Sequence, residues 1–183
     1  YGPAAGDPSL REAIAHKISH INKVPSSKDN ILITNGGKQA IFNLFQILLN
    51  PGEEVLIPSP YWLSYPEIAK FAQAKPIFID TSPEKGFSLD INKLESVISP
   101  RTKILILNSP CNPTGRVMKS QELEEIIELL RRHPNIYVVS DEIYEFLISK
   151  EEEHISIGQL AGDLRDRIFI VNGFAKAWAM TGW

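Results

Sequence analysis

Residues 103–115 have the sequence KILILNSPCNPTG, in which an apolar run ends at an asparagine and is followed by two prolines and turn residues. A short apolar run bounded by such residues is typical of a strand that is buried on both faces. Strands of this kind occur in parallel sheets covered by helices. Residues 103–108 therefore predict a parallel strand, and residues 109–115 should lie at its carboxyl end.

The same alternation of short apolar runs and amphipathic segments continues in both directions. Further strands are predicted at 31–34, 54–58, 76–80, 136–140 and 167–171. Helices are predicted near 10–22, 40–49, 63–73, 90–98 and 123–130. For the first helix, Ser9 and Glu12 form a capping-box pattern. The pattern predicts an α/β fold in which helices sandwich a mainly parallel sheet through right-handed crossovers.

Composition limits the class of protein. A chain of 183 residues with 43% hydrophobic and 22% charged residues can bury the core of one domain. A net charge of −3 and a pI near 5.8 provide no basic surface for nucleic acid or anionic membranes, which favours a small-molecule partner. Cys111 is the only cysteine, so no disulfide can form within the chain. No apolar run approaches the ~20 residues of a membrane span, and we expect a cytoplasmic protein.

In open α/β sheets, ligands bind at the carboxyl ends of the strands, so the residues that follow each strand are the candidates for a site. Gly36 and Gly37 precede a helix, where backbone N–H groups can approach an anion such as phosphate. A simple turn would explain two glycines equally well. Asp141 follows a strand and can keep a ring nitrogen protonated through a charge-assisted hydrogen bond. A helix cap or a salt bridge is the alternative role for Asp141.

Three other residues at these strand ends can contact a planar ligand. Trp62 can stack on a ring, and the Tyr144 hydroxyl can bind the same ligand, although core packing remains an alternative for both aromatic residues. Asn112 lies between prolines, on a stiff backbone that presents its amide at little ordering cost. The peptide bonds Ser59–Pro60 and Asn112–Pro113 are candidates for the cis form.

Lys176 lies within the sequence NGFAKAWAMTGW, residues 172–183. Its neighbours are small, apolar or aromatic, so the sequence predicts that the amine loses hydration and is more easily neutral. A neutral amine is the nucleophile that Schiff-base chemistry requires. The alternative is an ordinary solvated lysine.

Taken together, these segments resemble the large domain of a fold-type-I pyridoxal-phosphate enzyme, and specifically an aspartate-aminotransferase-like class I/II aminotransferase. Five motifs carry the resemblance, in the order and approximate spacing of that family. They are GGKQAIFNLF (36–45), PSPYWLSYPE (58–67), NSPCNPTG (108–115), SDEIYEFL (140–147) and AKAWAMTGW (175–183).

The resemblance implies a role for each candidate residue. Lys176 would form the Schiff base with pyridoxal 5′-phosphate and move the proton of the substrate α-carbon, and Asp141 would pair with the pyridinium nitrogen. The remaining contacts would be Asn112 and Tyr144 to the 3′-oxygen, Trp62 to the ring face, and Gly36, Gly37 and Lys38 to the phosphate. Trp62 and Asn112 would also border the substrate. Tyr1 would reach the phosphate of a neighbouring subunit, which implies a homodimer.

The resemblance also predicts what lies outside the chain. Residues 1–183 would be part of a cofactor-binding large domain, incomplete at both ends, with the N-terminal arm and the small domain absent. We therefore expect a segment of a longer protein that is a poor catalyst alone. Ala175 replaces a serine that is frequent in the family before the lysine, which removes one polar contact.

The function that the resemblance implies is transfer of an amino group between an amino acid, aspartate or a similar one, and a 2-oxo acid. Two alternatives stay open: a pyridoxal-phosphate-dependent C–S lyase or synthase on the same fold, and a non-catalytic effector domain of a regulator. A zinc site is disfavoured, because His16 and His20 have helical i, i+4 spacing but no obvious further ligands.

Overall fold

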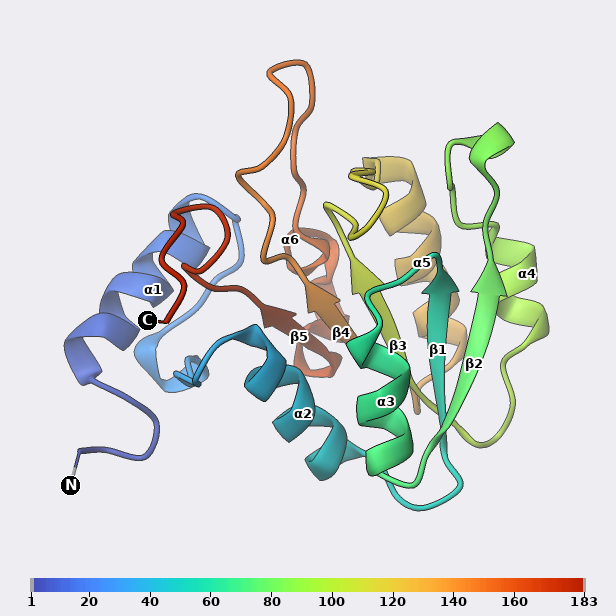
Figure 1. The fold of residues 1–183 in the computed structure, drawn as a ribbon, viewed down its shortest axis with the longest axis horizontal. Coiled ribbons are helices and arrows are strands. Elements are labelled where there is room, and N and C mark those ends of the chain that lie inside the picture. Colours follow the sequence, from blue (N-terminus) through green and yellow to red (C-terminus); the bar gives the residue numbers. More distant parts are fainter. Residues whose placement is uncertain (1, 183) are drawn as a thin grey trace.

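The computed structural model describes residues 2–182, and at its centre is a five-stranded sheet in which every pair of neighbours is parallel (Figure 1). The strands are β1 Glu54–Ser59, β2 Lys75–Asp80, β3 Thr102–Asn108, β4 Tyr137–Asp141 and β5 Ile168–Val171. Their order in the sheet is β2-β1-β3-β4-β5. The predicted α/β fold with a parallel sheet is confirmed.

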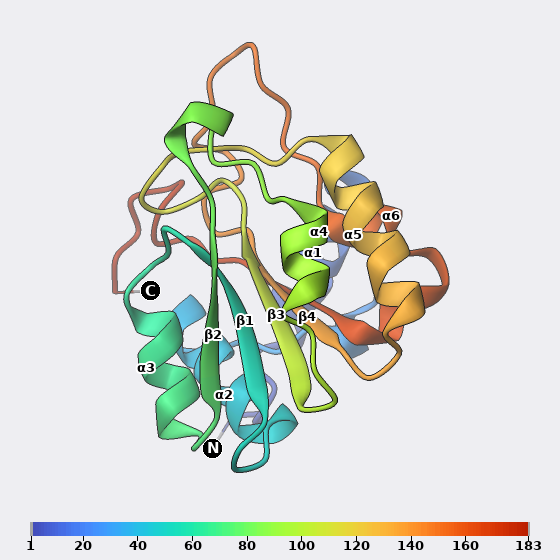
Figure 2. The same cartoon turned by 90° about the vertical axis from the view of Figure 1, so that its right-hand side faces the viewer.

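Helices cover both faces of this sheet. They are α1 Pro8–His20, α2 Gly37–Leu48, α3 Ser64–Phe71, α4 Ile91–Ser96, α5 Ser120–Arg132 and α6 Ile157–Leu160, with 3-10 turns at Lys28–Asn30, Pro83–Lys85 and Gly162–Arg167. Figure 2 shows α2 and α3 on one side and α4, α5 and α6 on the other. Helix α1 lies beyond β5, close to the C-terminal segment (Figure 1).

The chain changes direction across the sheet between β1 and β3. After β1 it passes through α3 to β2 at one edge, and then returns past β1 to build β3, β4 and β5 on the other side. Such a reversal leaves a crevice at the carboxyl ends of the central strands, because the connections on its two sides leave toward opposite faces. The segments after β1, β3 and β4 therefore meet at the carboxyl ends of the strands.

Side chains of the central strands alternate between two apolar cores. Leu56 and Leu105 pack with the core on the side of α4 and α5, whereas Ile57 and Ile104 pack with the core on the side of α2 and α3. Successive residues of a strand point to opposite faces, so a strand that is covered on both sides needs an apolar residue at every position. This is why residues 104–107 form an uninterrupted apolar run.

Helix α2 allows burial to be tested with two identical substitutions. Ile41 is fully buried against the sheet, while Ile47 in the same helix is 77% exposed. Ile41→Ala should lower the free energy of unfolding by about 2–5 kcal/mol, because it removes buried methyl groups and leaves a cavity. Ile47→Ala should change it by no more than about 0.5 kcal/mol. Equilibrium urea unfolding measures both, and equal effects would contradict the packing of α2.

The predicted strand at 31–34 is wrong. These residues form no strand, and their backbone groups bind elsewhere: Arg11 Nε donates to the Ile31 carbonyl at 2.8 Å, and the Ile33 N–H donates to the Ala5 carbonyl at 3.0 Å. Leu32 is 59% exposed. β-Branched residues favour an extended backbone, but a strand also requires a neighbouring strand to pair with. Local preference alone does not supply that partner.

The other predicted strands and helices are present, with small shifts at their ends. The predicted cap of α1 is wrong: the Asp7 carboxylate, not Ser9, accepts the Leu10 N–H at 2.9 Å. Pro8 occupies the first helical position, where its missing N–H costs nothing, so the cap lies before it. The bonds Ser59–Pro60 and Asn112–Pro113 are cis as considered, and Ser109–Pro110 is cis as well. Within residues 2–182, no helix combines the length and apolar character needed to cross a membrane.

Candidate functional site

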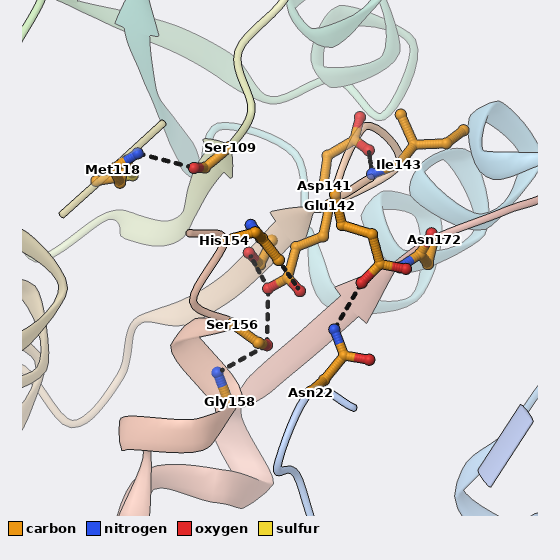
Figure 3. A network of polar contacts seen from close by, with 12 residues as sticks. Asn22, Ser109, Met118, Asp141, Glu142, Ile143, His154, Ser156, Gly158 and Asn172 are labelled. Carbon is orange, nitrogen blue, oxygen red and sulfur yellow. Dashed lines mark hydrogen bonds and ion pairs between the residues drawn. The ribbon is translucent and has the colours of Figure 1, made fainter. Parts of the chain in front are cut away.

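Asp141 ends β4 at the carboxyl edge of the sheet, with only 5% of its surface exposed. The Tyr65 hydroxyl donates to its Oδ2 at 2.7 Å, and the Ile143 N–H donates to its Oδ1 at 3.3 Å, as Figure 3 shows for Ile143. Burial raises the pKa of Asp141 to about 6, although these two hydrogen bonds act in the opposite direction. Burial also raises the pKa of Tyr65 well above its usual range, so its hydroxyl remains a donor.

Two asparagines connect Asp141 to Tyr144. Asn108 lies opposite Asp141 in the register of β3 and β4, and its Nδ2 donates to the Asp141 carbonyl at 2.9 Å. Asn108 Oδ1 accepts the backbone N–H of Asn112 at 2.7 Å. Asn112 Nδ2 in turn donates to the Tyr144 hydroxyl at 3.3 Å. The structure therefore brings together three predicted site residues: Asp141, Asn112 and Tyr144.

The N-terminus of α2 lies beside this network. Gly36 precedes the helix with a φ of +80°, a backbone conformation that glycine adopts without strain, and no side chain of the described residues caps the helix. Gly37 is buried, and a Cβ there would approach Ile143 and Val171 to 3.3 Å. Close packing and the missing cap leave N–H groups of the first turn free to bind an anion.

Trp62 and Lys38 stand next to the same helix end. The Trp62 ring is half-buried and meets the Tyr65 ring edge-on, with 5.4 Å between centroids. The Lys38 ammonium is exposed and lies 5.1 Å from the centroid of the Trp62 ring. Through Tyr65, which binds Asp141, Trp62 is joined to the network. Its place on the ring face of a ligand stays a prediction.

The predicted loss of hydration at Lys176 is wrong for the described residues, because this side chain is exposed. Its apolar neighbours do not cover it: Phe174 and Trp178 are themselves 42% and 57% exposed. A run of apolar residues becomes water-poor only where another layer packs over it. Within residues 2–182, the contacts that connect the Lys176 segment to the site are made by residues on either side of Lys176, not by its own side chain. Tyr1, the other predicted phosphate contact, lies outside the described residues.

Sequence reasoning missed Tyr65 and Asn108. Both contacts are made between elements that are far apart in the chain, α3 with β4 and β3 with β4. Tyr65 is 2% exposed. The available signal was that a buried tyrosine hydroxyl needs a polar partner, and the charged residues at strand ends are the natural candidates.

Glu142, beside Asp141, is almost completely buried and serves a separate cluster. The hydroxyls of Ser140 and Ser156 each donate to its Oε1 at 2.9 Å, and His154 Nε2 lies 3.2 Å from its Oε2 (Figure 3). Ligand atoms of Glu142, Glu145 and His154 lie within 4.8 Å of one another, close enough for a metal ion. Hydrogen bonds and ion pairs within the chain already occupy the carboxylate oxygens, so we assign no metal to them.

The site suits pyridoxal 5′-phosphate, the cofactor that the resemblance implies. Among residues 2–182, the buried carboxylate of Asp141 receives only a hydroxyl and a backbone N–H, which leaves its charge available to a cationic ring nitrogen. The uncapped end of α2 suits a phosphate group. A cavity of about 50 Å³ near Tyr65, Asn108 and Cys111 is much smaller than the ~300–1,000 Å³ of ligand pockets, so the cofactor would lie outside it.

Known proteins resemble this chain over its whole length. The family model described as aminotransferase class I and II matches residues 1–183. The probable aspartate/prephenate aminotransferase of Rickettsia bellii is 45% identical over 183 residues, which cover 100% of this chain and 46% of that protein. The bifunctional aspartate aminotransferase and glutamate/aspartate-prephenate aminotransferase of Petunia hybrida is 48% identical, with coverage of 100% and 38%.

Solved structures give the same result. The aspartate aminotransferase of Thermus thermophilus with maleate has a TM-score of 0.95 and 48% identity, covering 100% of this chain and 47% of that one. The aspartate aminotransferase of Rhizobium meliloti has a TM-score of 0.97 and 38% identity, with coverage of 100% and 46%. The chain thus spans about half the length of the relatives that it matches. By its sequence and its fold, this chain belongs to the class I and II aminotransferase family.

Proposed function

We propose that the protein containing this chain is a pyridoxal-phosphate-dependent aminotransferase, and that residues 1–183 form part of its cofactor-binding large domain. The observation that carries the proposal is the buried carboxylate of Asp141, a residue whose backbone carbonyl is joined through Asn108 and Asn112 to Tyr144 and which is flanked by the uncapped end of α2. Family membership supports it. An unpaired carboxylate is costly to bury, so its place is best explained by a cationic group that binds there.

When bound, the cofactor supplies an electrophilic carbon and a conjugated ring that accepts electrons from the substrate α-carbon. Asp141 holds a proton on the ring nitrogen, which strengthens the ring as an electron acceptor. Asn112 and Tyr144 hydrogen-bond the ring oxygen and so fix the orientation of the ring. Trp62 packs against the ring face and excludes water from it.

Two other groups complete the proposed site. Gly36, Gly37 and Lys38 hold the phosphate through backbone N–H groups, aided by the positive end of the α2 dipole. Lys176 would hold the cofactor covalently through its amine, and the same amine would carry the proton of the substrate α-carbon.

For the substrates, we propose aspartate or a similar amino acid as the amino-group donor and a 2-oxo acid as the acceptor. Named relatives act on aspartate and prephenate, which supports a dicarboxylic substrate of this kind. Trp62 and Asn112 would border the substrate as well as the cofactor. The alternatives of a C–S lyase or a regulator domain gain no support, since the relatives named above are aminotransferases.

We further propose that the complete protein is a cytoplasmic homodimer in which Tyr1 binds the phosphate of the neighbouring site. The resemblance supports this assembly, and the acidic composition with a single cysteine supports the location.

The assignment of Lys176 can be tested chemically. Pyridoxal phosphate is added to the complete protein, the product is reduced with borohydride, and its peptides are analysed by mass spectrometry. We expect the pyridoxyl group on Lys176, because the proposed site assigns covalent attachment of the cofactor to that amine. Lys176→Arg should abolish the adduct, and Lys150→Arg, a change at an exposed lysine, should not. An adduct on a different lysine would count against the proposed site.

A further inference from the structure

Glu145 has a carboxylate that is buried between three segments of the chain, with only 5% of the residue exposed. Its Oε2 accepts the Asn22 amide at 2.6 Å, and its Oε1 accepts the Asn172 amide at 2.7 Å. The ammonium of Lys17, in α1, pairs with the same Oε1. Figure 3 shows Asn22 and Asn172 near each other although they come from distant parts of the chain.

These three contacts compensate for the burial of the Glu145 charge. An isolated carboxylate would lose several kcal/mol on burial, and a cation together with two amide donors compensates for that loss. The Lys17 side chain is only 26% exposed, so water screens the pair weakly. The Glu145 carboxylate is therefore a fixed point between α1, the segment after β4 and the segment after β5.

The link to Asn172 extends to the backbone that leads to Lys176. Asn172 Oδ1 accepts the Gly173 N–H at 2.7 Å, which fixes the turn directly after β5. Just before it, the Val171 carbonyl accepts the Glu142 N–H at 2.8 Å. The start of the lysine segment is thus attached to the segment that contains Glu145.

Phe146, the next residue, holds the other end of the lysine segment. Its ring lies 5.4 Å from that of Trp178, centroid to centroid, and the Lys17 ammonium lies 5.2 Å from the Phe146 centroid. The Trp178 N–H closes the loop by donating to the Phe174 carbonyl at 3.3 Å. Consecutive residues, Glu145 and Phe146, therefore hold points on both sides of Lys176.

We propose that Glu145 is a positioning residue that sets the place of Lys176 relative to Asp141 and Tyr144. The short segment 141–146 contains two proposed cofactor contacts, Asp141 and Tyr144. It also contains Glu145 and Phe146, the two residues that hold the lysine segment. One rigid segment would thus fix the distance between the amine and the groups that hold the ring. The inference rests on the proposed function in so far as Lys176 is the residue that attaches the cofactor.

The first test uses the complete protein without cofactor and measures amide hydrogen exchange in residues 172–180. Glu145→Gln keeps the shape of the side chain but removes the charge and turns an NH₂ group toward one of its donors. Exchange in 172–180 should become at least about tenfold faster, because local opening then costs less. Glu153→Gln removes a charge from an exposed residue of the segment after β4, which also contains Glu145, and should leave exchange in 172–180 unchanged.

Residues of β3 provide an internal reference for this measurement. If Glu145→Gln accelerates exchange in β3 as much as in 172–180, or leaves 172–180 unchanged, the positioning role is overturned. Asn172→Ala removes the same link from its other end and serves where Glu145→Gln fails to fold. Since both variants disrupt the same contact, that between Glu145 and Asn172, exchange in the double variant should be hardly faster than in either single variant. Additive effects would also count against the proposal.

A second readout uses the cofactor-loaded enzyme. Glu145 is not proposed to touch the substrate, so Glu145→Gln should lower kcat about tenfold and leave KM for the amino acid within about twofold. Equal loss in Glu153→Gln, or a change confined to KM, would overturn the inference. A wild-type protein that takes up no pyridoxal phosphate would refute the proposed function, while the hydrogen-exchange result would still decide whether Glu145 anchors the loop.

Discussion

Lys176→Ala should lower the rate of transamination by the complete protein at least about 10⁴-fold. The proposed amine has two tasks, covalent attachment of the cofactor and transfer of the α-carbon proton, and each contributes a large factor to the rate. The alanine side chain can perform neither. Cofactor binding should survive in weakened form, because Asp141, Asn112, Tyr144 and the end of α2 remain in place.

The measurement is a single turnover of the cofactor-loaded protein with aspartate, followed by the absorbance of the cofactor. Lys150→Ala is the matched control, since Lys150 is exposed and lies in the loop after β4. It should react at the wild-type rate. If Lys176→Ala kept a tenth of the wild-type rate or more, another group would have to carry the proton, and the proposed role of Lys176 would be wrong.

The sequence predicted the sheet well where a strand is buried on both faces. Residues 104–107 are apolar at successive positions because the two cores take alternate residues, and this demand is visible in a single run. The segment 31–34 has the same local character but remains unpaired, since Arg11 and Ala5 bind its backbone. Pairing depends on residues distant in sequence, which explains why this prediction failed.

The candidate site shows the same division. Asp141 and Asn112 were predicted from their places after strands, and Tyr144 from its place near Asp141, because topology brings the carboxyl ends of parallel strands to one edge. Tyr65 and Glu145 were missed because their roles depend on partners 76 and 27 positions away, Asp141 and Asn172. Burial of Lys176 was predicted from its immediate neighbours, whereas exposure depends on whatever packs over them.

Asp141→Asn should stabilise the cofactor-free protein above neutral pH. In the folded protein the pKa of Asp141 is about 6, above the ordinary value of 3.8, so folding favours the protonated acid. Its contribution to stability is therefore fully present below pH ~4 and is lost as the pH rises through 6, where the folded state must hold a buried charge. The difference of about two pKa units corresponds to roughly 3 kcal/mol at most. Asparagine is neutral at every pH, so the variant should gain about 1–3 kcal/mol over the wild type at pH 8.

Urea unfolding of the cofactor-free proteins at pH 4 and pH 8 measures this effect. The gain should be largest at pH 8 and should be below about 1 kcal/mol at pH 4, where Asp141 is protonated in the folded state and partly protonated in the unfolded state. A variant that is less stable than the wild type at pH 8 would show that the Tyr65 hydrogen bond outweighs the buried charge. Tyr65→Phe helps to separate these terms, because it removes the hydroxyl donor and leaves the carboxylate.

The same substitution should have the opposite effect on catalysis. Without a carboxylate to hold the proton on the ring nitrogen, kcat/KM should fall about 10²–10³-fold, the usual loss when a preorganised electrostatic contact is removed. A buried charge that only supported the fold would lower stability when neutralised and would leave the chemistry unchanged. Gain of stability together with loss of rate is expected only if the charge of Asp141 is kept for a cation that the described residues do not themselves provide, and the proposed cofactor supplies that cation.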